Sequence, residues 1–381
     1  MKNFNNLFYI GILVISAAFL FFGNHIASQN MFVSDAEGML IYSATVLEIA
    51  DRIELFDDFI PDWFMTSKII FFYAEITSGP MQGQIVVVEQ ALSYGMMREV
   101  ATGDRILLIY NDFFGEFWFM DFVRINYIIF LGIAFFVALV LFGKLKGFNS
   151  IISLAFICMA IFMVFIPAIL SGVNIYLAAA IICVYAIVST LFIVIGLNKK
   201  AFSAILGCLG GVLIAAILML AMSAIMQLTG MTDHETRNLL NIPTTTPINL
   251  SAIIFAGVII GATGAIMDVA MSISSSLWEL RQAKPDATFK QLFKSGLEIG
   301  KDILGTMLNT LILAYIGSSL SLIILISAST TTMLELFNRE LILVEFLRAM
   351  VGGFGMFATI PLTAAICGWL YLNKQKIDRP H

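Results

Sequence analysis

The sequence predicts a polytopic α-helical membrane protein with about eight transmembrane helices and a small extracytoplasmic all-β domain, an OB-like barrel, inserted after the first helix. Of the 381 residues, 60% are hydrophobic and only 12% are charged, whereas a soluble domain carries about a quarter charged residues. The charges cluster between long apolar runs, and about 20 apolar residues in a helix cross the ~30 Å hydrocarbon core of a bilayer. Only residues 24–125 depart from this pattern.

The first apolar run, Leu7 to Phe22, follows Lys2 at the start of the chain. Such a run is typical both of a cleaved signal peptide and of a retained anchor. The residues directly after the run do not form the small-x-small pattern of a cleavage site. We therefore predict that residues 1–23 are a signal anchor and the first transmembrane helix.

Residues 24–125 contain short runs in which β-branched and aromatic residues alternate with polar ones, separated by turn residues such as Gly79-Pro80. This pattern predicts about five strands, and a small antiparallel barrel fits their number and length. The block holds 15 acidic and 5 basic residues, so it does not favour nucleic acid as a partner. The predicted strands are Met39–Glu48, Ile69–Thr77, Gln84–Glu89, Arg105–Tyr110 and Gly115–Arg124.

Seven further apolar runs are each long enough to span a bilayer, some of them with tilt. They form a predicted transmembrane bundle over residues 126–371, and residues 372–381 follow as a short tail. The predicted spans are 126–143, 149–170, 174–197, 202–228, 250–275, 303–327 and 349–371.

Basic residues between the spans predict the orientation, because short basic loops stay in the cytoplasm. Placing the N-terminus in the cytoplasm leaves only Arg237, Arg339 and Arg348 in the opposite loops. We therefore predict a multi-pass protein of the cell membrane with both termini cytoplasmic and residues 24–125 extracytoplasmic. The basic residues on the cytoplasmic side are then Lys144, Lys146, Lys199, Lys200, Arg281, Lys284, Lys290, Lys294, Lys374, Lys376 and Arg379.

Between the sixth and seventh spans, Phe289, Leu292, Phe293 and Leu297 fall on one helical face, and the charged residues of the segment point elsewhere. This pattern predicts a cytoplasmic amphipathic helix over residues 288–300 that lies on the inner surface of the membrane. The residues expected at the cytoplasmic interface of the seventh span are Lys301 and Asp302.

The sixth span contains an acidic residue, Asp268, eleven residues before Glu279. At ~1.5 Å per residue, this spacing corresponds to a depth of roughly 16 Å, about half of the hydrocarbon core. If the apolar core ends near Ser275, the depth is closer to roughly 10 Å. An ionised carboxylate at either depth is costly and requires a partner, water or a proton. We therefore predict that Asp268 is proton-titratable and serves as a proton carrier.

Small residues share a helical stripe with Asp268, and small residues let a second helix approach closely. Thr306 or Asn309 of the seventh span is the expected hydrogen-bond partner of Asp268. The alternative is that the polar stripe only holds the helices together. The predicted intramembrane polar centre is Asp268, Ser272, Thr306 and Asn309, and the glycines expected at close helix contacts are Gly261, Gly264, Gly305, Gly352 and Gly353.

The sequence contains no pattern typical of a catalytic, cofactor or metal site. The three histidines lack metal-ligand spacing, and the four cysteines all lie within apolar runs. There is no Walker loop, no metalloprotease histidine pair and no nucleophile elbow. We therefore predict that the protein is not an enzyme, and an ATP-driven pump is disfavoured.

The sixth and seventh spans contain a specific series of residues. The series is Gly261-Ala-Thr-Gly-Ala-Ile-Met-Asp268-Val-Ala-Met, then Glu279-Leu280 and Pro285, then Ser295-Gly296-Leu-Glu-Ile-Gly300-Lys-Asp302-Ile-Leu-Gly305-Thr-Met-Leu-Asn309-Thr-Leu-Ile-Leu-Ala-Tyr315-Ile-Gly317. With this series and with its general layout, the chain resembles the YibE/F family of bacterial multi-pass membrane proteins. The resemblance implies a companion membrane subunit of the same family and supplies no catalytic residues.

Two functions from different classes follow from these features. The first is a transporter or export-coupling protein that uses the proton-titratable Asp268. The alternative is a non-transporting scaffold or envelope-assembly factor whose acidic extracytoplasmic domain binds a partner. The expected partners are the lipid bilayer and either a companion YibE/F-like subunit or an envelope protein, with no nucleic acid; the substrate has no signature in the sequence.

Overall fold

The structure is a computed structural model. It describes residues 2–28, 39–54, 66–93, 98–111, 115–232, 234–242, 244, 246–329 and 332–372. The chain divides into two compact units, Met1–Phe32 with Val140–His381, and Val33–Leu139. The predicted tail, residues 372–381, lies outside the described residues apart from its first residue.

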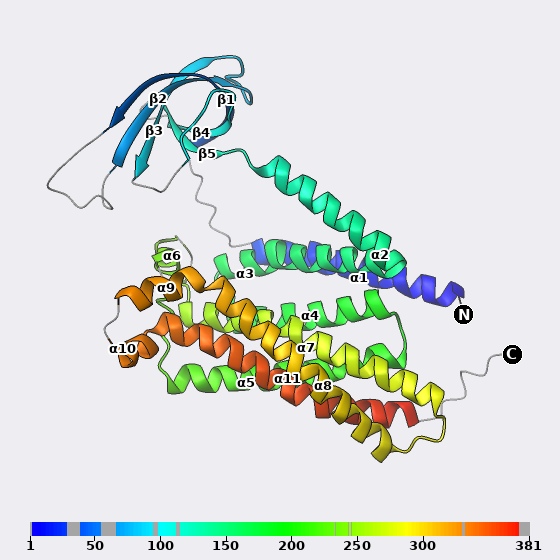
Figure 1. Cartoon of the computed structure of the whole chain (residues 1–381). Helices are drawn as coiled ribbons and strands as arrows, with labels where there is room; N and C mark the ends of the chain where they lie inside the picture. Colours follow the sequence, from blue (N-terminus) through cyan, green and yellow to red (C-terminus); the bar gives the residue numbers. More distant parts are fainter. Residues whose placement is uncertain are drawn as a thin grey trace. The chain divides into compact units, whose positions relative to one another are not determined.

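A closed five-stranded barrel forms most of the unit Val33–Leu139 (Figure 1). Its strand order is β1-β2-β3-β5-β4, in which β4 pairs antiparallel with β1 and β3 pairs parallel with β5. Closure gives every described strand a neighbour on both sides. The small β domain that the sequence predicted is thereby confirmed as a five-stranded barrel. The strands are β1 (Met39–Glu54), β2 (Thr66–Ile76), β3 (Ile85–Ser93), β4 (Arg105–Asn111) and β5 (Glu116–Phe122).

The barrel interior follows the alternation of side chains along its strands, because successive residues of a strand point to opposite faces. Gln90 of β3 is a polar residue within this alternation, and its side chain is fully buried. Its Nε2 donates to Arg98 O, and its Oε1 accepts from Val100 N, both at 3.0 Å. These bonds satisfy the buried amide. The apolar interior consists of Ala44, Val46, Ile70, Phe72, Ala74, Val88, Leu92, Val100, Ile106 and Leu108.

An ion pair on the barrel surface predicts that the stability of the barrel depends slightly on pH. Lys68 Nζ donates to Glu99 Oε1 at 2.6 Å, and this hydrogen bond holds the pKa of Glu99 below its ordinary value. A carboxyl with a lowered pKa stabilises the fold above its unfolded pKa of about 4.3, and the contribution is lost as the pH falls through the folded value. Exposed pairs contribute little, so the expected loss of stability is small.

Thermal unfolding of the barrel followed from pH 6 to pH 3, in wild type and in Glu99→Gln, measures this contribution. The unfolding temperature of the wild type is expected to exceed that of the variant near pH 6, and the difference is expected to disappear in the acidic part of that range. An equal difference between the two proteins at every pH would contradict the assignment.

Seven helices among the described residues are long and apolar enough to cross a membrane, whereas the sequence predicted about eight. The count is one lower because Ile125–Leu170 is counted once, as a run of 46 residues. This run joins two helices across a kink at Lys144, between the predicted spans 126–143 and 149–170. Lys144 has non-helical φ 49° and ψ −131°. The helices outside the later bundle are α1 (Lys2–Ser28), α2 (Ile125–Ala160), the π-helix η1 (Ile161–Phe165) and α3 (Ile166–Leu170).

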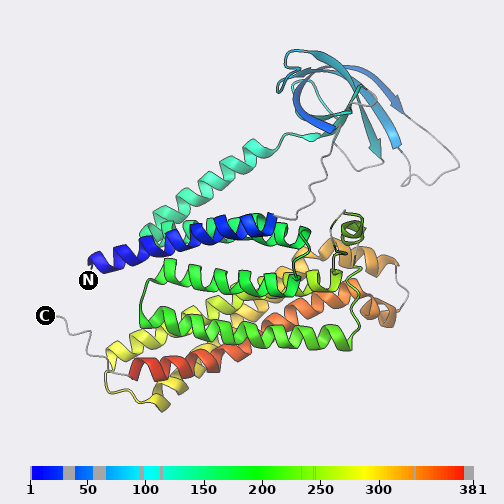
Figure 2. The same cartoon turned by 180° about the vertical axis from the view of Figure 1, so that it is seen from behind.

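The remaining helices form the bundle shown in Figures 1 and 2, in which α5, α7 and α11 lie side by side. The contact of α5 with α11 is very close. A Cβ atom added to Gly207 would overlap Thr363 Oγ1, and one added to Gly211 would overlap Thr359 Oγ1. The helices are α4 (Ile175–Ile195), α5 (Lys199–Ile225), α6 (His234–Asn238), the 3-10 helix η2 (Leu239–Asn241), α7 (Leu250–Ala283), α8 (Phe289–Ser318), α9 (Leu320–Ser329), α10 (Met333–Asn338) and α11 (Glu340–Leu372).

Helix α8 differs from the prediction for its region. The predicted amphipathic helix 288–300, from Phe289 on, and the predicted span 303–327, as far as Ser318, form one continuous helix. Its apolar side packs on α11: Leu292 is fully buried, and a Cβ atom on Gly368 would lie 2.8 Å from the Phe289 ring. The apolar face of this segment therefore packs on α11, and its predicted position at the membrane surface stays a prediction.

Candidate functional site

The predicted acid lies near the middle of α7. Asn249 caps the helix by accepting a hydrogen bond from Ala252 N at 3.1 Å, and Asp268 follows Leu250 by 18 residues and precedes Ala283 by 15. Ile266 and Ile273 are fully buried against α5 and α11, and Asp268 is exposed. At 100° per residue, Asp268 points roughly opposite to Ile266. The carboxyl therefore lies on the side of α7 turned away from the bundle core.

The polar residues predicted on the next span lie on α8. Thr288 begins this helix with a capping box that it shares with Gln291. Thr306 and Asn309 are exposed, and Thr306 Oγ1 donates to Ile303 O at 2.9 Å within the helix. The side of α8 that packs on α11 consists instead of Leu304, Leu308, Leu311 and other apolar residues.

Two contacts place Asp268 and Thr306 at the same level along the antiparallel pair α7 and α8. A Cβ atom on Gly261 would lie 3.1 Å from Tyr315 Oη, and one on Gly296 would lie 3.0 Å from Leu277 Cδ1. Interpolation between the contacts sets Asp268 opposite about residue 307 of α8. Because α11 packs on both helices, their exposed residues lie on one side of the pair, which we call the α7–α8 outer face.

The structure thus gathers three of the predicted residues on one surface without joining them. No hydrogen bond or ion pair among the described residues involves Asp268 or Asn309. The fourth residue, Ser272, is half-buried on α7. Chemically, the arrangement offers one carboxyl that takes up and releases a proton, beside an amide and hydroxyls that form hydrogen bonds. Its role as an intramembrane polar centre stays a prediction.

The predicted glycines occupy two kinds of position. Gly352 and Gly353 are buried in α11, where added Cβ atoms would lie 3.1 Å from Leu311 and 3.0 Å from Leu308. They therefore allow α8 to approach α11 closely. Gly264 and Gly305 are exposed, and an added Cβ atom would meet no heavy atom within 4 Å at either position.

The predicted interface residues Lys301 and Asp302 lie inside α8, because this helix begins twelve residues before Lys301. Lys301 Nζ donates to Glu298 Oε1 at 3.0 Å, and both side chains are exposed. Asp302 is also exposed, and it lies on α8 four residues, or about one turn, before Thr306. Their assignment to the cytoplasmic boundary stays a prediction.

A buried hydroxyl cluster was missed by the sequence reasoning. Ser203 of α5, Ser274 of α7 and Tyr371 of α11 lie within 2.8 to 2.9 Å of one another through their hydroxyl oxygens. Tyr371 donates to Ser274 O at 3.0 Å, and Ser274 Oγ donates to Lys200 O at 2.7 Å. The cluster ties the three central helices together. Its residues are far apart in the sequence and share no spacing pattern, so no local signal identified them.

Replacing Tyr371 by phenylalanine tests this cluster. The variant removes one hydroxyl from a fully bonded buried network, and the expected loss of stability is about 1–3 kcal/mol. Thermal unfolding in detergent measures the loss, and Tyr176→Phe, near the start of α4, is a matched control. Equal midpoints for the two variants would contradict a stabilising role of the Tyr371 hydroxyl.

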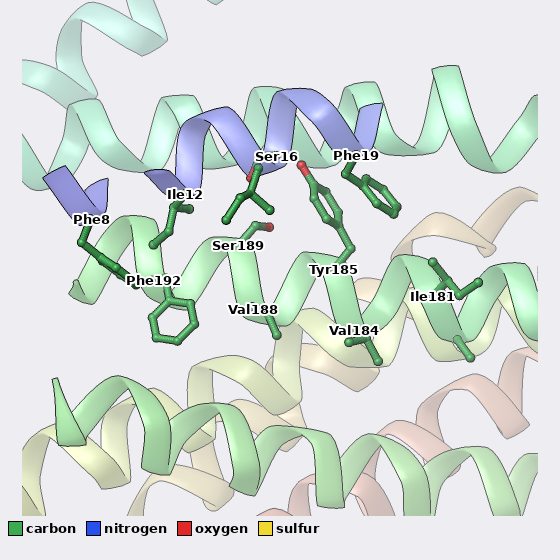
Figure 3. Close-up of a pocket in the computed structure, with 12 residues that line it drawn as sticks. Phe8, Ile12, Ser16, Phe19, Ile181, Val184, Tyr185, Val188, Ser189 and Phe192 are labelled. Atoms are coloured by element: carbon green, nitrogen blue, oxygen red, sulfur yellow. The ribbon is translucent and has the colours of Figure 1, made fainter. Parts of the chain in front are cut away.

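Helix α1 packs on α4 and leaves a cavity of about 580 Å³ between them (Figure 3). Phe19 of α1 stacks on Tyr185 of α4 with ring centroids 4.2 Å apart. The Tyr185 hydroxyl points toward Ser16, and Phe8 lies beside Phe192 in an edge contact of 5.6 Å. These contacts attach α1 to α4 of the bundle. Apart from its few hydroxyls the cavity is apolar.

Comparison with known proteins identifies a family. A family model described as YibE/F-like protein matches residues 131–373, well over half of the chain. This match confirms the resemblance that the residues of α7 and α8 carried. The search of curated proteins and the search of solved structures gave no match.

Among the described residues, no group of three histidine, cysteine, aspartate or glutamate side chains is placed to hold a metal ion.

Proposed function

We propose that this chain, which belongs to the YibE/F-like family, is a proton-coupled transporter or export-coupling protein of the bacterial cell membrane. The observation that carries the proposal is the position of Asp268, midway along a helix of 34 residues that is apolar enough to cross a membrane. A carboxyl at mid-membrane is costly, and such groups are typical of ion and proton pathways.

The proposed topology places both termini in the cytoplasm and the acidic barrel, which we take to be OB-like, outside the cell. The strand order and the parallel pairing of β3 with β5 support the OB-like assignment. We propose that α1 is retained as an anchor. Its stacking on α4 supports this, because cleavage of residues 1–23 would remove Phe19 from Tyr185.

Asp268 would act as a carrier of one proton per cycle. In its neutral form the carboxyl is tolerated in hydrocarbon, and in its ionised form it requires water or hydrogen-bond donors. A change in the exposure of the α7–α8 outer face would therefore accompany protonation. In this proposal the protein performs no covalent chemistry and is not an enzyme.

A strain that lacks the chain provides the test. Its growth is compared with that of the parent across external pH, metal ions and envelope-targeting compounds. A transporter is expected to produce a pH-dependent change of sensitivity to a defined group of compounds or ions, and the full chain is expected to restore it. A phenotype that does not vary with pH would contradict proton coupling.

The scaffold function remains a second candidate because of an exposed apolar patch on the barrel. Tyr73 of β2, Val87 of β3 and Trp118 of β5 are all exposed. Tyr73 pairs directly with Val87, and β5 lies beside β3. Apolar patches of this kind mark interaction sites. If the barrel binds an envelope protein through this patch, Trp118→Ser is expected to reproduce the deletion phenotype while Asp268→Asn does not.

A further inference from the structure

The α7–α8 outer face is not covered by any other described residue of the chain. On α7 it consists of Gly257, Gly264 and Asp268, and on α8 it includes Thr306 and Asn309. All five residues are exposed. Within the described part of the chain, these residues therefore face the surroundings of the bundle, which the proposed function identifies as lipid.

Lipid is an unsuitable neighbour for these groups. Thr306 Oγ1 and Thr310 Oγ1 each donate to a backbone oxygen of α8 at 2.9 Å, so the threonines have partners. The Asp268 carboxyl and the Asn309 amide have no such bond to any described residue. An amide or a carboxyl left without hydrogen bonds in an apolar medium costs several kcal/mol. A protein surface with matching hydrogen-bond donors and acceptors is therefore expected to cover this face.

The glycines of the face support the same conclusion. Added Cβ atoms on Gly257, Gly264 and Gly305 would meet no heavy atom within 4 Å. Gly207 and Gly211, in contrast, are in close contact with α11. A glycine inside a helix costs about 1 kcal/mol relative to alanine, and within a membrane glycine permits close helix contacts. Gly257, Gly264 and Gly305 have no such contact with the described residues of their own chain.

The polar groups of the face are complementary to themselves. Helix α7 presents an acceptor, the Asp268 carboxyl, and α8 presents a donor, the Asn309 amide, within about one turn of the same level. A two-fold axis along the membrane normal keeps every residue at its depth and brings α7 of one copy onto α8 of the other. In such an isologous contact the same pairing forms twice.

We propose that the protein is a homodimer in the membrane, with the α7–α8 outer face as its interface and with Asn309 of the partner subunit close to Asp268. A second copy explains both the uncovered polar groups and the unused glycines. The proposal rests on the membrane insertion contained in the proposed function, and it completes the site, because each carboxyl gains its donor only from the partner subunit.

Disulfide cross-linking in membranes tests the interface. All chains carry Cys158→Ser, because Cys158 is the exposed native cysteine among the described residues. One tagged chain carries Gly264→Cys and a second, differently tagged chain carries Thr310→Cys, since these positions lie at about the same level. After oxidation with copper phenanthroline, the two tags are expected in one band of doubled mass. The control pair is Leu213→Cys with Ile217→Cys, both exposed on α5. It is expected to give several-fold less of the cross-linked band.

A mass measurement supplies a second readout. In nanodiscs of phosphatidylethanolamine and phosphatidylglycerol, the wild-type protein is expected to have the mass of two chains. Gly264→Leu is expected to have the mass of one chain, because the new side chain meets nothing in its own copy and fills the interface. A monomeric wild type, or cross-linking no stronger than that of the control pair, overturns the proposal, as does a complex formed only with another family member.

The two proposals fail in different ways. If the wild type is monomeric and Asp268→Asn still abolishes activity, the dimer is wrong and the proton-coupled function stands. If the dimer forms and Asp268→Asn remains fully active, the dimer stands and the proton-coupled function is wrong.

Discussion

Replacing Asp268 by asparagine is expected to abolish the activity of the protein while leaving its expression and folding intact. Asparagine is nearly isosteric with aspartate but cannot bind and release a proton. Because Asp268 is exposed on α7, its replacement breaks no hydrogen bond or ion pair to the described residues. In the strain that lacks the chain, Asp268→Asn is therefore expected to restore no growth, and Asp268→Glu to restore it in part.

The matched control is Asp302→Asn, since Asp302 is also exposed and lies on α8 of the same pair. The control is expected to restore growth almost completely. Full restoration by Asp268→Asn would remove the proton-carrier role and leave the scaffold function.

A chemical measurement checks the same carboxyl without knowledge of the substrate. Hydrophobic carbodiimides modify carboxyl groups that lie within hydrocarbon, and mass spectrometry locates the adduct. Wild type is expected to be modified at Asp268, and the modification is expected to be absent in Asp268→Asn. Glu279 is an exposed acid outside the predicted span 250–275, and its modification with equal efficiency would contradict the membrane position of Asp268.

Replacing Gly211 by leucine is expected to cause the largest loss of stability of any single substitution proposed for this chain. An added Cβ atom would overlap Thr359 Oγ1 and would lie 2.9 Å from Gly355 O. Because one of these neighbours is backbone, α5 and α11 must move apart. Overpacking of a tight core typically costs about 1–3 kcal/mol. Because the Cβ atom alone already overlaps its neighbours, the cost is expected at or above the upper end of this range, which corresponds to a fall of about 10 °C in the unfolding midpoint.

Thermal unfolding in detergent measures this loss. Gly132→Leu is the matched control, because an added Cβ atom at Gly132 meets no heavy atom within 4 Å. The control midpoint is expected to stay within about 2 °C of wild type, as for other substitutions away from tight packing. Similar midpoints for the two variants would contradict the close contact of α5 with α11.

The sequence alone was sufficient for the class of the protein and for much of its architecture. Runs of about 20 apolar residues predicted membrane-spanning helices because hydrocarbon requires every backbone group to be bonded within the segment. Alternating residues predicted the barrel strands because the side chains of a strand point to opposite faces. Both signals are local, and the same is true of the residues from Gly261 to Gly317 that carried the family resemblance.

The tertiary structure decided which partner each helix face packs against. From the sequence, the apolar side of 289–297 fits a membrane surface as well as another helix, and only packing assigns it to α11. Likewise, the spacing of Asp268, Thr306 and Asn309 predicts a shared stripe but not whether it faces inward or outward. The hydroxyl cluster of Ser203, Ser274 and Tyr371 joins residues up to 168 positions apart. Contacts across such distances depend on how the helices rotate against one another, and no local pattern encodes that rotation.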